Sequence, residues 1–159
     1  MHKNLKHIDP DSVTRIDQNM VNFIYLSKEL ISFHTESIDT MVAKAAGFNA
    51  SVDICGFLYY YDHYFVQYLE GEKKHVEPLM HRIEADERHE VIVTLKKENI
   101  KYQKFPGWHM ENLDRGQSSI QAGHVLFQLM EVLYRKTESV DPKSQENVWN
   151  FVRKFSKSL

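Results

Sequence analysis

ICGFLYYYDHYFVQYL, residues 54–69, has the pattern of a β-hairpin. Branched and aromatic residues dominate 54–61 and 64–69, and both residue types favour extended backbone. Asp62 and His63 lie between the two runs, at the place of a two-residue turn. We therefore predict two antiparallel strands, and the flanking elements indicate which kind of sheet they join.

The segments that flank the hairpin alternate between strand and helix patterns. Residues 22–27 (NFIYLS) predict a strand, and the helix that follows is predicted to begin at Ser37 and to end at Gly47. A second helix is predicted after the hairpin, and Pro78 is expected to kink or delay it. The apolar faces of the two helices are Ile38, Met41, Val42 and Ala45 in the first and Val76, Leu79, Met80 and Ile83 in the second.

Two further strands, at 90–95 and 108–112, complete the series. The order strand, helix, strand, strand, helix, strand, strand predicts a ferredoxin-like α+β fold, with two helices on one face of one sheet. Two amphipathic helices later in the chain, separated by Asp141-Pro142, are expected to cover the other face.

The length of 159 residues suits one domain with a modest extension. We place a lead-in at 1–20, the domain at 21–113 and a helical extension at 114–159.

The bulk composition argues against several classes of protein. Twenty Lys and Arg against 22 Asp and Glu give a formal net charge of -2, without the basic excess of a nucleic-acid-binding protein. The single cysteine, Cys55, cannot form an internal disulfide and lies in an apolar run, so we predict a buried, unreactive side chain. We find no signal-peptide pattern and no membrane-spanning stretch, and we therefore expect a cytoplasmic protein that does not bind a membrane.

Three polar residues do not fit a plain apolar core. Strand alternation places Gln67 on a predicted core face, where a glutamine must find hydrogen-bond partners. Tyr25 lies on the first strand, which neighbours the third strand in this fold, so its hydroxyl could reach Gln67. A glutamine bonded to backbone is the more common explanation for the strand alone. A buried ligand with carbonyl groups and ring nitrogens, such as a flavin, would satisfy Gln67 and Asn49 together.

Five segments between Phe23 and Leu113 resemble the BLUF family, the blue-light sensors that use FAD. The segments are IYLS (24–27), FNASVDICGFLYY (48–60), FVQYLEG (65–71), RIEADERH (82–89) and FPGWHM (105–110). They occur in the order and spacing of the family, within a stretch that covers more than half of the chain. The resemblance implies a flavin photoreceptor with FAD as its cofactor.

The resemblance also implies a role for each matching residue. Tyr25 matches the photoactive tyrosine, Gln67 the glutamine between that tyrosine and the flavin, and Asn49 the asparagine that bonds the flavin ring. Trp108 and Met110 match a signal-relaying pair on the fifth strand, and we expect these two side chains to face the same way. The positions near the ring edge, the ribityl chain and the phosphates are matched by Arg82, Asp86 and Arg88, and His89 completes that motif in a structural role.

Three positions depart from the pattern of the family. His63 stands where the family usually has glycine, Phe48 where it often has a polar residue, and Cys55 where threonine is common. The tyrosine, glutamine and asparagine remain in place. We therefore expect the departures to affect flavin affinity or recovery rate rather than the chemistry.

The photocycle that the resemblance implies depends on Tyr25 and Gln67. Blue light excites the oxidised flavin, Tyr25 donates an electron, and the tyrosine proton moves through Gln67, whose side chain ends in a rearranged state. A flavin carbonyl then gains a stronger hydrogen bond, and absorption shifts reversibly to the red. Such proton movement requires a group that both donates and accepts, and a side-chain amide does both.

Two other functions remain open from the residues alone. A ferredoxin-like binding module without flavin would explain the fold and the core. An enzyme would need a metal or nucleotide site, but His75, His81 and His89 lack tight ligand spacing, and we find no glycine-rich phosphate loop. We therefore expect no metal site and no catalysis. The expected partners are an unidentified downstream signalling protein, reached by direct contact, and further copies of the chain in a homo-oligomer.

Overall fold

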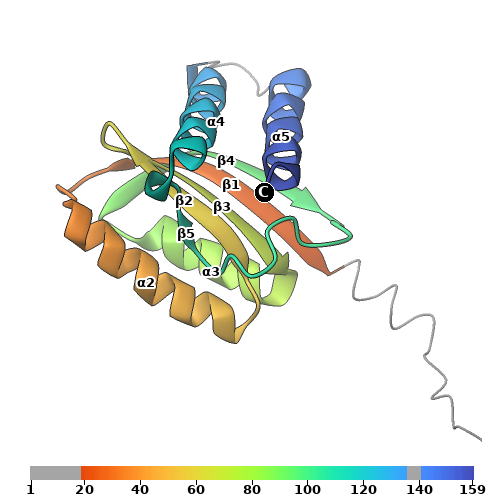
Figure 1. Cartoon of the computed structure of the whole chain (residues 1–159), viewed down its shortest axis with the longest axis horizontal. Helices are drawn as coiled ribbons and strands as arrows, with labels where there is room; N and C mark the ends of the chain where they lie inside the picture. Colours follow the sequence, from red (N-terminus) through yellow and green to blue (C-terminus); the bar gives the residue numbers. More distant parts are fainter. Residues whose placement is uncertain (1–18, 136–140) are drawn as a thin grey trace, which may run out of the picture.

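Five strands form one mixed sheet in the order β4-β1-β3-β2-β5 (Figure 1). The structure, a computed structural model, describes residues 19–135 and 141–159, so the predicted lead-in at 1–20 lies outside it except for the last two positions. The elements are β1 (Met20–Glu29), α2 (Thr35–Ser51), β2 (Cys55–Tyr61), β3 (Tyr64–Glu72), α3 (Lys73–Ala85), β4 (His89–Glu98), β5 (Glu111–Asn112), a 3-10 turn (Leu113–Arg115), α4 (Gln117–Arg135) and α5 (Pro142–Lys157).

The strand pairing confirms the predicted ferredoxin-like α+β fold. β1 lies between β3 and β4 and is antiparallel to both, and β2 is antiparallel to β3. Two residue pairs join β5 to β2 in parallel. The two central strands, β1 and β3, therefore come from different halves of the motif, which brings residues far apart in sequence into direct register.

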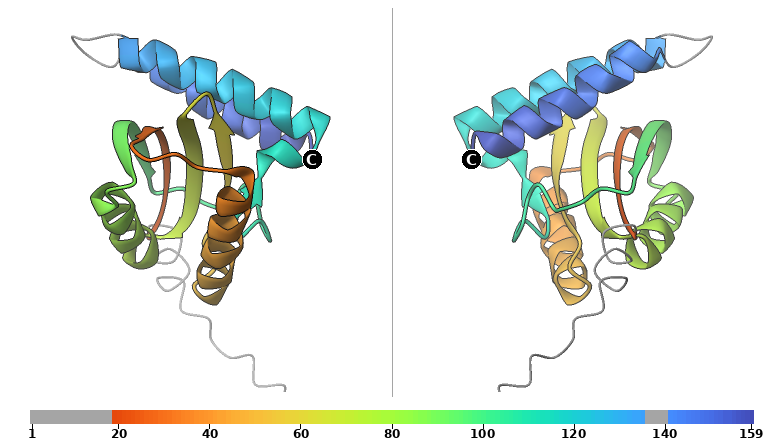
Figure 2. Two further views of the ribbon diagram at one scale, coloured as in Figure 1. Left: turned by 90° about the vertical axis from the view of Figure 1, so that its left-hand side faces the viewer. Right: turned by 90° about the vertical axis from the view of Figure 1, so that its right-hand side faces the viewer.

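Apolar side chains form a core on each face of the sheet, because successive strand residues point to opposite faces. On one face, Ile24 and Tyr68 belong to a core that includes buried residues of α4 and α5. On the other face, Tyr25 and Phe65 belong to a core that includes residues of α2 and α3. Figure 2 shows the two pairs of helices on opposite faces of the sheet. The prediction that the C-terminal helices cover the second face is confirmed.

Local sequence determines how α4 and α5 are placed. A Cβ atom at Gly123 of α4 would lie 2.5 Å from ring atoms of Tyr59, so glycine is what allows this close approach of helix to sheet. α5 begins at Pro142, and the carboxylate of Asp141 accepts a hydrogen bond from the backbone N–H of Lys143 (3.1 Å). This arrangement confirms Asp141-Pro142 as the start of a helix.

The β2–β3 hairpin turns through Asp62 and His63, as predicted. Both residues have positive φ, 49° and 70°, in the left-handed region that glycine adopts more easily. The backbone N–H of Glu29 donates to the carbonyl of His63 (2.9 Å), and the His63 ring pairs with the Glu29 carboxylate. These contacts stabilise the left-handed backbone of His63, at a position where the family usually has glycine.

Two predicted boundaries of the first helix, α2, are wrong. The helix begins at Thr35 with His34 as its N-cap, so Ser37 lies inside it. It also continues through Gly47 to Ser51, because an exposed glycine costs a helix only about 1 kcal/mol relative to alanine. The extra turn carries Asn49 to a buried position.

The predicted fifth strand at 108–112 is reduced to Glu111–Asn112. The backbone N–H of Trp108 donates to the carbonyl of Phe105 (3.1 Å), which folds this stretch into a turn instead of extended backbone. Pro78 lies inside α3 without delaying its start at Lys73. Pro78 is exposed, so solvent can reach the backbone where the proline removes a helical hydrogen bond.

Candidate functional site

A cavity of about 690 Å³ lies on the sheet face that carries α2 and α3. Its size is within the range of ligand pockets for small organic molecules. β1, β3, α2, α3 and the segment before β5 all contribute to its wall. The residues that line it are Tyr25, Phe33, Ser37, Thr40, Met41, Val42, Lys44, Ala45, Phe48, Asn49, Leu58, Phe65, Gln67, Leu79, Arg82, Ile83, Asp86, Arg88, His89 and Met110.

Tyr25 and Gln67 are direct cross-strand partners in the β1–β3 ladder. The Tyr25 hydroxyl donates a hydrogen bond to Oε1 of Gln67, and both side chains are buried. Burial, and to a lesser extent the charge of Asp86, raises the pKa of the Tyr25 hydroxyl far above its ordinary value of 10.0. The phenol is therefore protonated and available as a donor at any physiological pH.

The other end of the Gln67 amide contacts Met110. Nε2 of Gln67 donates to Sδ of Met110 (3.5 Å), a weak acceptor. The glutamine thus bridges a tyrosine on β1 and a methionine on the loop before β5. A side-chain amide has a donor and an acceptor at its two ends, so a half-turn of this group would exchange the groups that face Tyr25 and Met110.

Trp108 does not face the same way as Met110, and this prediction is wrong. Met110 belongs to the core on the cavity face, whereas Trp108 packs on the core under α4 and α5. The Trp108 ring stacks on Phe105 (5.4 Å between ring centroids) and meets Phe155 of α5 edge-on (6.1 Å). The two-residue alternation of a strand does not hold here, because the backbone is turned before β5 begins.

The buried side chain of Asn49 uses only one of its two polar atoms in a hydrogen bond to the described residues. Its Nδ2 donates to the backbone carbonyl of His109 (2.7 Å). Its Oδ1 is buried and has no hydrogen-bond partner within the described ranges. A buried acceptor without a donor costs about 1–3 kcal/mol, so Asn49 points to a ligand that donates a hydrogen bond.

Several charged side chains line the cavity. Asp86 and Arg88 form a bidentate pair, with Nη2 of Arg88 2.6 Å from Oδ2 of Asp86, and these hydrogen bonds lower the pKa of Asp86 to about 2. The guanidinium of Arg82 lies over the ring of Phe48, 4.7 Å from its centroid. The aromatic residue that replaces a polar one at position 48 therefore makes a cation–π contact at the cavity.

His89 forms part of the wall beside the tyrosine. Its ring meets Tyr25 edge-on (6.1 Å between centroids), Nε2 donates to the carbonyl of Ile83 (2.6 Å), and Nδ1 bonds Oγ of Ser27 (2.8 Å). Both ring nitrogens are thus used within the protein. These contacts agree with the structural role predicted for His89.

Sequence reasoning missed much of the apolar wall. Helical spacing assigns Met41, Val42 and Ala45 to the core, but they are only half-buried and line the cavity. Phe33, from the loop after β1, contributes another part of the wall and packs edge-on against Phe65 (5.0 Å). Helical periodicity identifies an apolar face but does not distinguish protein neighbours from a ligand.

Comparison with known proteins assigns the chain to a family. The family model described as "Sensors of blue-light using FAD" (BLUF) matches residues 20–111, which is more than half of the chain. The chain therefore belongs to the BLUF family. It is a flavin photoreceptor for blue light, as the resemblance in the sequence implied.

Individual relatives agree with this assignment. The photoactivated adenylate cyclase subunit beta of Euglena gracilis is 28% identical over 96 residues, which are 59% of this chain. The chain spans only 11% of the length of that relative. A solved bacterial light-regulated adenylyl cyclase is 28% identical with a TM-score of 0.58, and the match covers 72% of this chain and 35% of that one.

The BLUF protein BlrB in its dark state has the same fold. The TM-score is 0.61 at 24% identity, and the match covers 89% of this chain and 98% of that one. Another solved relative, Klebsiella pneumoniae BlrP1, has a structure with FMN. In the described part of this chain, no helix is both long and apolar enough to cross a membrane.

The residues of the cavity fit a flavin. The unpartnered Oδ1 of Asn49 is an acceptor for the ring N–H of an isoalloxazine, and Gln67 offers an amide to its carbonyl groups. The aliphatic and aromatic walls from α2 and the sheet suit the faces of a flat aromatic ring. Arg82 and Lys44 also line the cavity, and their positive charges would suit phosphate groups.

Proposed function

We propose that Tyr25 and Gln67 are the photoactive pair of this receptor, and that Met110 and Trp108 carry their state to α5. The observation that supports the pair most directly is the hydrogen bond from the Tyr25 hydroxyl to Oε1 of Gln67 inside the cavity. The cofactor is FAD, held through the ring by Asn49 and Gln67 and through its outer groups by Arg82, Asp86 and Arg88.

A bound flavin supplies the absorption of blue light and an excited state that accepts an electron. Tyr25 is the donor of that electron, and its buried hydroxyl also holds the proton that must move. The phenol is protonated at rest, and Oε1 of Gln67 already accepts its hydrogen bond, so the proton has a route as soon as the electron leaves. Proton and electron therefore leave Tyr25 together without large movement of the protein.

After the electron and proton transfer, the Gln67 side chain makes a different set of hydrogen bonds. In the described state its oxygen faces Tyr25 and its nitrogen faces Met110. Rotation of the amide places a donor toward Tyr25 and removes the donor from Sδ of Met110. Tautomerisation places a donor on Oε1 toward Tyr25 without rotation. The electron and the proton return to Tyr25, so the net change is confined to the Gln67 amide. The changed pattern reverts thermally, since no bond between heavy atoms of the protein has been broken.

The route to the other face passes through the loop before β5. Met110 senses Gln67 on the cavity face, and two residues earlier Trp108 contacts Phe155 of α5. The segment between them is anchored, because the N–H of Gly56 donates to the carbonyl of Trp108 (2.6 Å). A shift of Met110 is thereby transmitted along a short, tethered backbone to the helix that covers the opposite face.

Glu70 holds the start of the same loop. Its buried carboxylate accepts hydrogen bonds from the backbone N–H groups of Phe105 (2.7 Å) and Lys104 (3.0 Å), and from the Tyr68 hydroxyl (2.7 Å). Because Phe105 stacks on Trp108, Glu70 fixes the platform on which the tryptophan rests. Glu70 is therefore a positioning residue for the relay.

The output that we propose is contact with a separate signalling protein in the cytoplasm, rather than catalysis by this sensor region. The cyclases among its relatives are described as light-regulated or photoactivated, which supports a sensor whose state is read by another unit. The proposed division is a sensor at 21–113 and a helical extension at 114–159 that presents the signal. Assembly into a homo-oligomer is part of the proposal.

Absorption spectroscopy of the purified full chain with FAD tests the photoactive pair. We expect a small red shift under blue light that reverts in the dark, and we expect Tyr25→Phe and Gln67→Leu to keep the flavin but lose the shift. Tyr61→Phe, an exposed tyrosine on β2, is the matched control and should behave like the native chain. A normal shift in Tyr25→Phe would overturn the assignment, and a native chain that binds no flavin would favour a binding module.

A further inference from the structure

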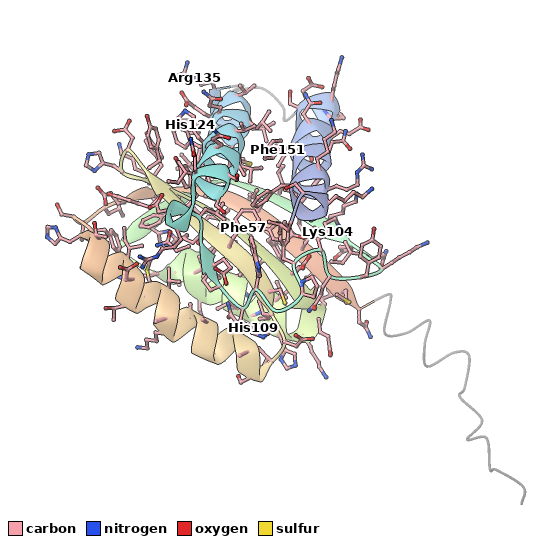
Figure 3. The ribbon with its side chains drawn as sticks, viewed as in Figure 1. Phe57, Lys104, His109, His124, Arg135 and Phe151 are labelled. Atoms are coloured by element: carbon pink, nitrogen blue, oxygen red, sulfur yellow. The ribbon has the colours of Figure 1, made fainter. Side chains whose placement is uncertain are left out.

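A second group of side chains with ligand chemistry lies outside the flavin cavity. One ligand atom each from Asp53, Cys55 and His109 lies within 4.8 Å of the other two. Asp53 follows α2, Cys55 is the first residue of β2, and His109 lies on the loop before β5. Figure 3 shows His109 on that loop, above the C-terminal part of α2. None of the three lines the flavin cavity.

One nitrogen of the His109 ring is already held by the protein backbone. Its Nδ1 lies 3.0 Å from the backbone carbonyl of Ile54. A carbonyl only accepts hydrogen bonds, so Nδ1 carries the proton and the lone pair of a neutral ring is at Nε2. Metal-binding histidines are commonly fixed in this way, with the second nitrogen bonded to a backbone carbonyl.

Cys55 contributes a sulfur atom to the group. It is the first residue of β2 and is fully buried, so its side chain has a fixed place in the core. A cation that takes the place of the thiol proton would offset the cost of a buried negative charge.

The charges and the solvent exposure of the three side chains also suit a divalent cation. A thiolate and the Asp53 carboxylate together carry two negative charges, which balance one divalent cation. The set of one sulfur, one nitrogen and one oxygen suits zinc in a tetrahedral site, with water as the fourth ligand. Asp53 is exposed and His109 is half-buried, so the group is open on the side from which a hydrated ion arrives.

We propose that Asp53, Cys55 and His109 form a binding site for a divalent cation of the zinc class. The proposal departs from the expectation of no metal site, which considered His75, His81 and His89. A bound ion would tie His109 to the end of α2 and the start of β2. The carbonyl of His109 accepts from Asn49, and Trp108 and Met110 are its neighbours in sequence. If the relay operates as proposed above, the ion restrains its loop and changes the rate of dark recovery.

Calorimetric titration of the full flavin-loaded chain with ZnCl2, in the dark, tests the site. We expect one zinc ion per chain at this site, and binding more than about tenfold weaker in Asp53→Asn and His109→Gln. Asparagine tolerates the positive φ of residue 53 (52°), so Asp53→Asn is the variant least open to misfolding. His81→Gln, on the exposed side of α3, is the matched control and should bind as the native chain does.

Cobalt substitution provides a second measurement that identifies the ligands. Tetrahedral coordination with a thiolate gives intense visible bands on the red side of flavin absorption, and Cys55→Ser should lose them. The site is disproved if the native chain binds no zinc, or if binding is unchanged in Asp53→Asn and His109→Gln. Dark recovery is then timed with zinc and with EDTA: a change in the native chain but not in Asp53→Asn supports the coupling, and no change in either overturns it. The titration does not depend on light, so it stands even if the proposed photocycle fails.

Discussion

The side chain of Asn49 donates a hydrogen bond from Nδ2 to the backbone carbonyl of His109, at 2.7 Å. This bond links the last turn of α2 to the loop that carries Met110 and Trp108. It also fixes the direction of the amide, so that Oδ1 is buried without a donor among the residues that the structure describes. Asn49 therefore connects the ligand cavity and the relay loop through the two ends of one side chain.

Asn49→Ala is expected to weaken flavin binding. The acceptor that the flavin would satisfy is worth about 1–3 kcal/mol, which corresponds to a dissociation constant roughly 5- to 150-fold higher. Quenching of flavin fluorescence during titration of the apoprotein measures this dissociation constant. Asn22→Ala is the control. Asn22 also has a buried Oδ1 with no partner in the described part of the chain, but its Nδ2 donates to the Tyr68 hydroxyl on the opposite face. Equal losses in the two variants would mean that Asn49 acts only through folding.

Met110→Leu is expected to slow dark recovery about two- to fivefold. Leucine keeps the volume but cannot accept the hydrogen bond from Nε2 of Gln67, so the resting orientation of the amide loses a stabilising contact. The decay of the red-shifted spectrum measures the rate. Met80→Leu changes a buried methionine of α3 that does not line the cavity, and its recovery should match the native chain. An unaltered rate in Met110→Leu would exclude this contact from the photocycle.

Trp108→Ala is expected to keep the light-induced red shift but to lose the light-dependent change in α5. The indole lies on the far face, so the red shift should keep its size, while the contact with Phe155 is lost. Hydrogen exchange of α5 amides, compared between darkness and blue light, measures the transmitted change. We expect a light-dependent difference in the native chain and little or none in the variant. Trp149→Phe, on α5 itself, keeps an aromatic ring there and serves as the control.

We expect the buried Glu70 carboxyl to make the free energy of unfolding depend on pH. Burial raises the pKa of this carboxyl above its ordinary value, although three hydrogen bonds oppose the effect. Glu70 therefore binds a proton more tightly in the folded state than in the unfolded state. The stabilisation from this proton is present below the unfolded pKa and is lost as pH rises through the folded pKa. In urea unfolding at a series of pH values, the native chain should lose stability relative to Glu70→Gln as pH rises from about 4 to neutrality.

The matched control for Glu70 is Glu72→Gln, an exposed carboxylate on the same strand. Its free energy of unfolding should follow the native chain at every pH. Parallel curves for the native chain and Glu70→Gln would show that the buried carboxyl does not titrate in this range.

Periodicity in the sequence was sufficient for most of the architecture. The alternation in 54–69 fixed which residues face which core, since a strand has a period of two and a buried face cannot tolerate a shift by one residue. The strand order then placed β1 beside β3, so that Tyr25 and Gln67 could meet. Residues 24–27 and 65–71, with the other family segments, pointed to the flavin without knowledge of any tertiary contact.

The sequence failed where the backbone leaves regular structure. Alternation put Trp108 and Met110 on one face, but the turn before β5 puts them on opposite faces of the sheet. Gly47 indicated a helix end, yet α2 continues by another turn to Ser51, which carries Asn49 to its bond with His109. The turn before β5 is held by the hydrogen bond from Trp108 to Phe105 and by the distant Gly56. Periodicity along one strand or helix does not reveal these contacts.

By itself, the sequence determined the fold class and the two faces of the sheet, because these depend on spacing along single strands and helices. It identified the proposed photoactive pair only through the resemblance of its segments to the family. Only the tertiary structure decided the partner of each polar group. It oriented the Gln67 amide toward Tyr25 and Met110, left Oδ1 of Asn49 for a ligand, and brought His109 to Asp53 and Cys55. Those relationships join segments distant in sequence, and their geometry is set by how the sheet and its loops pack together.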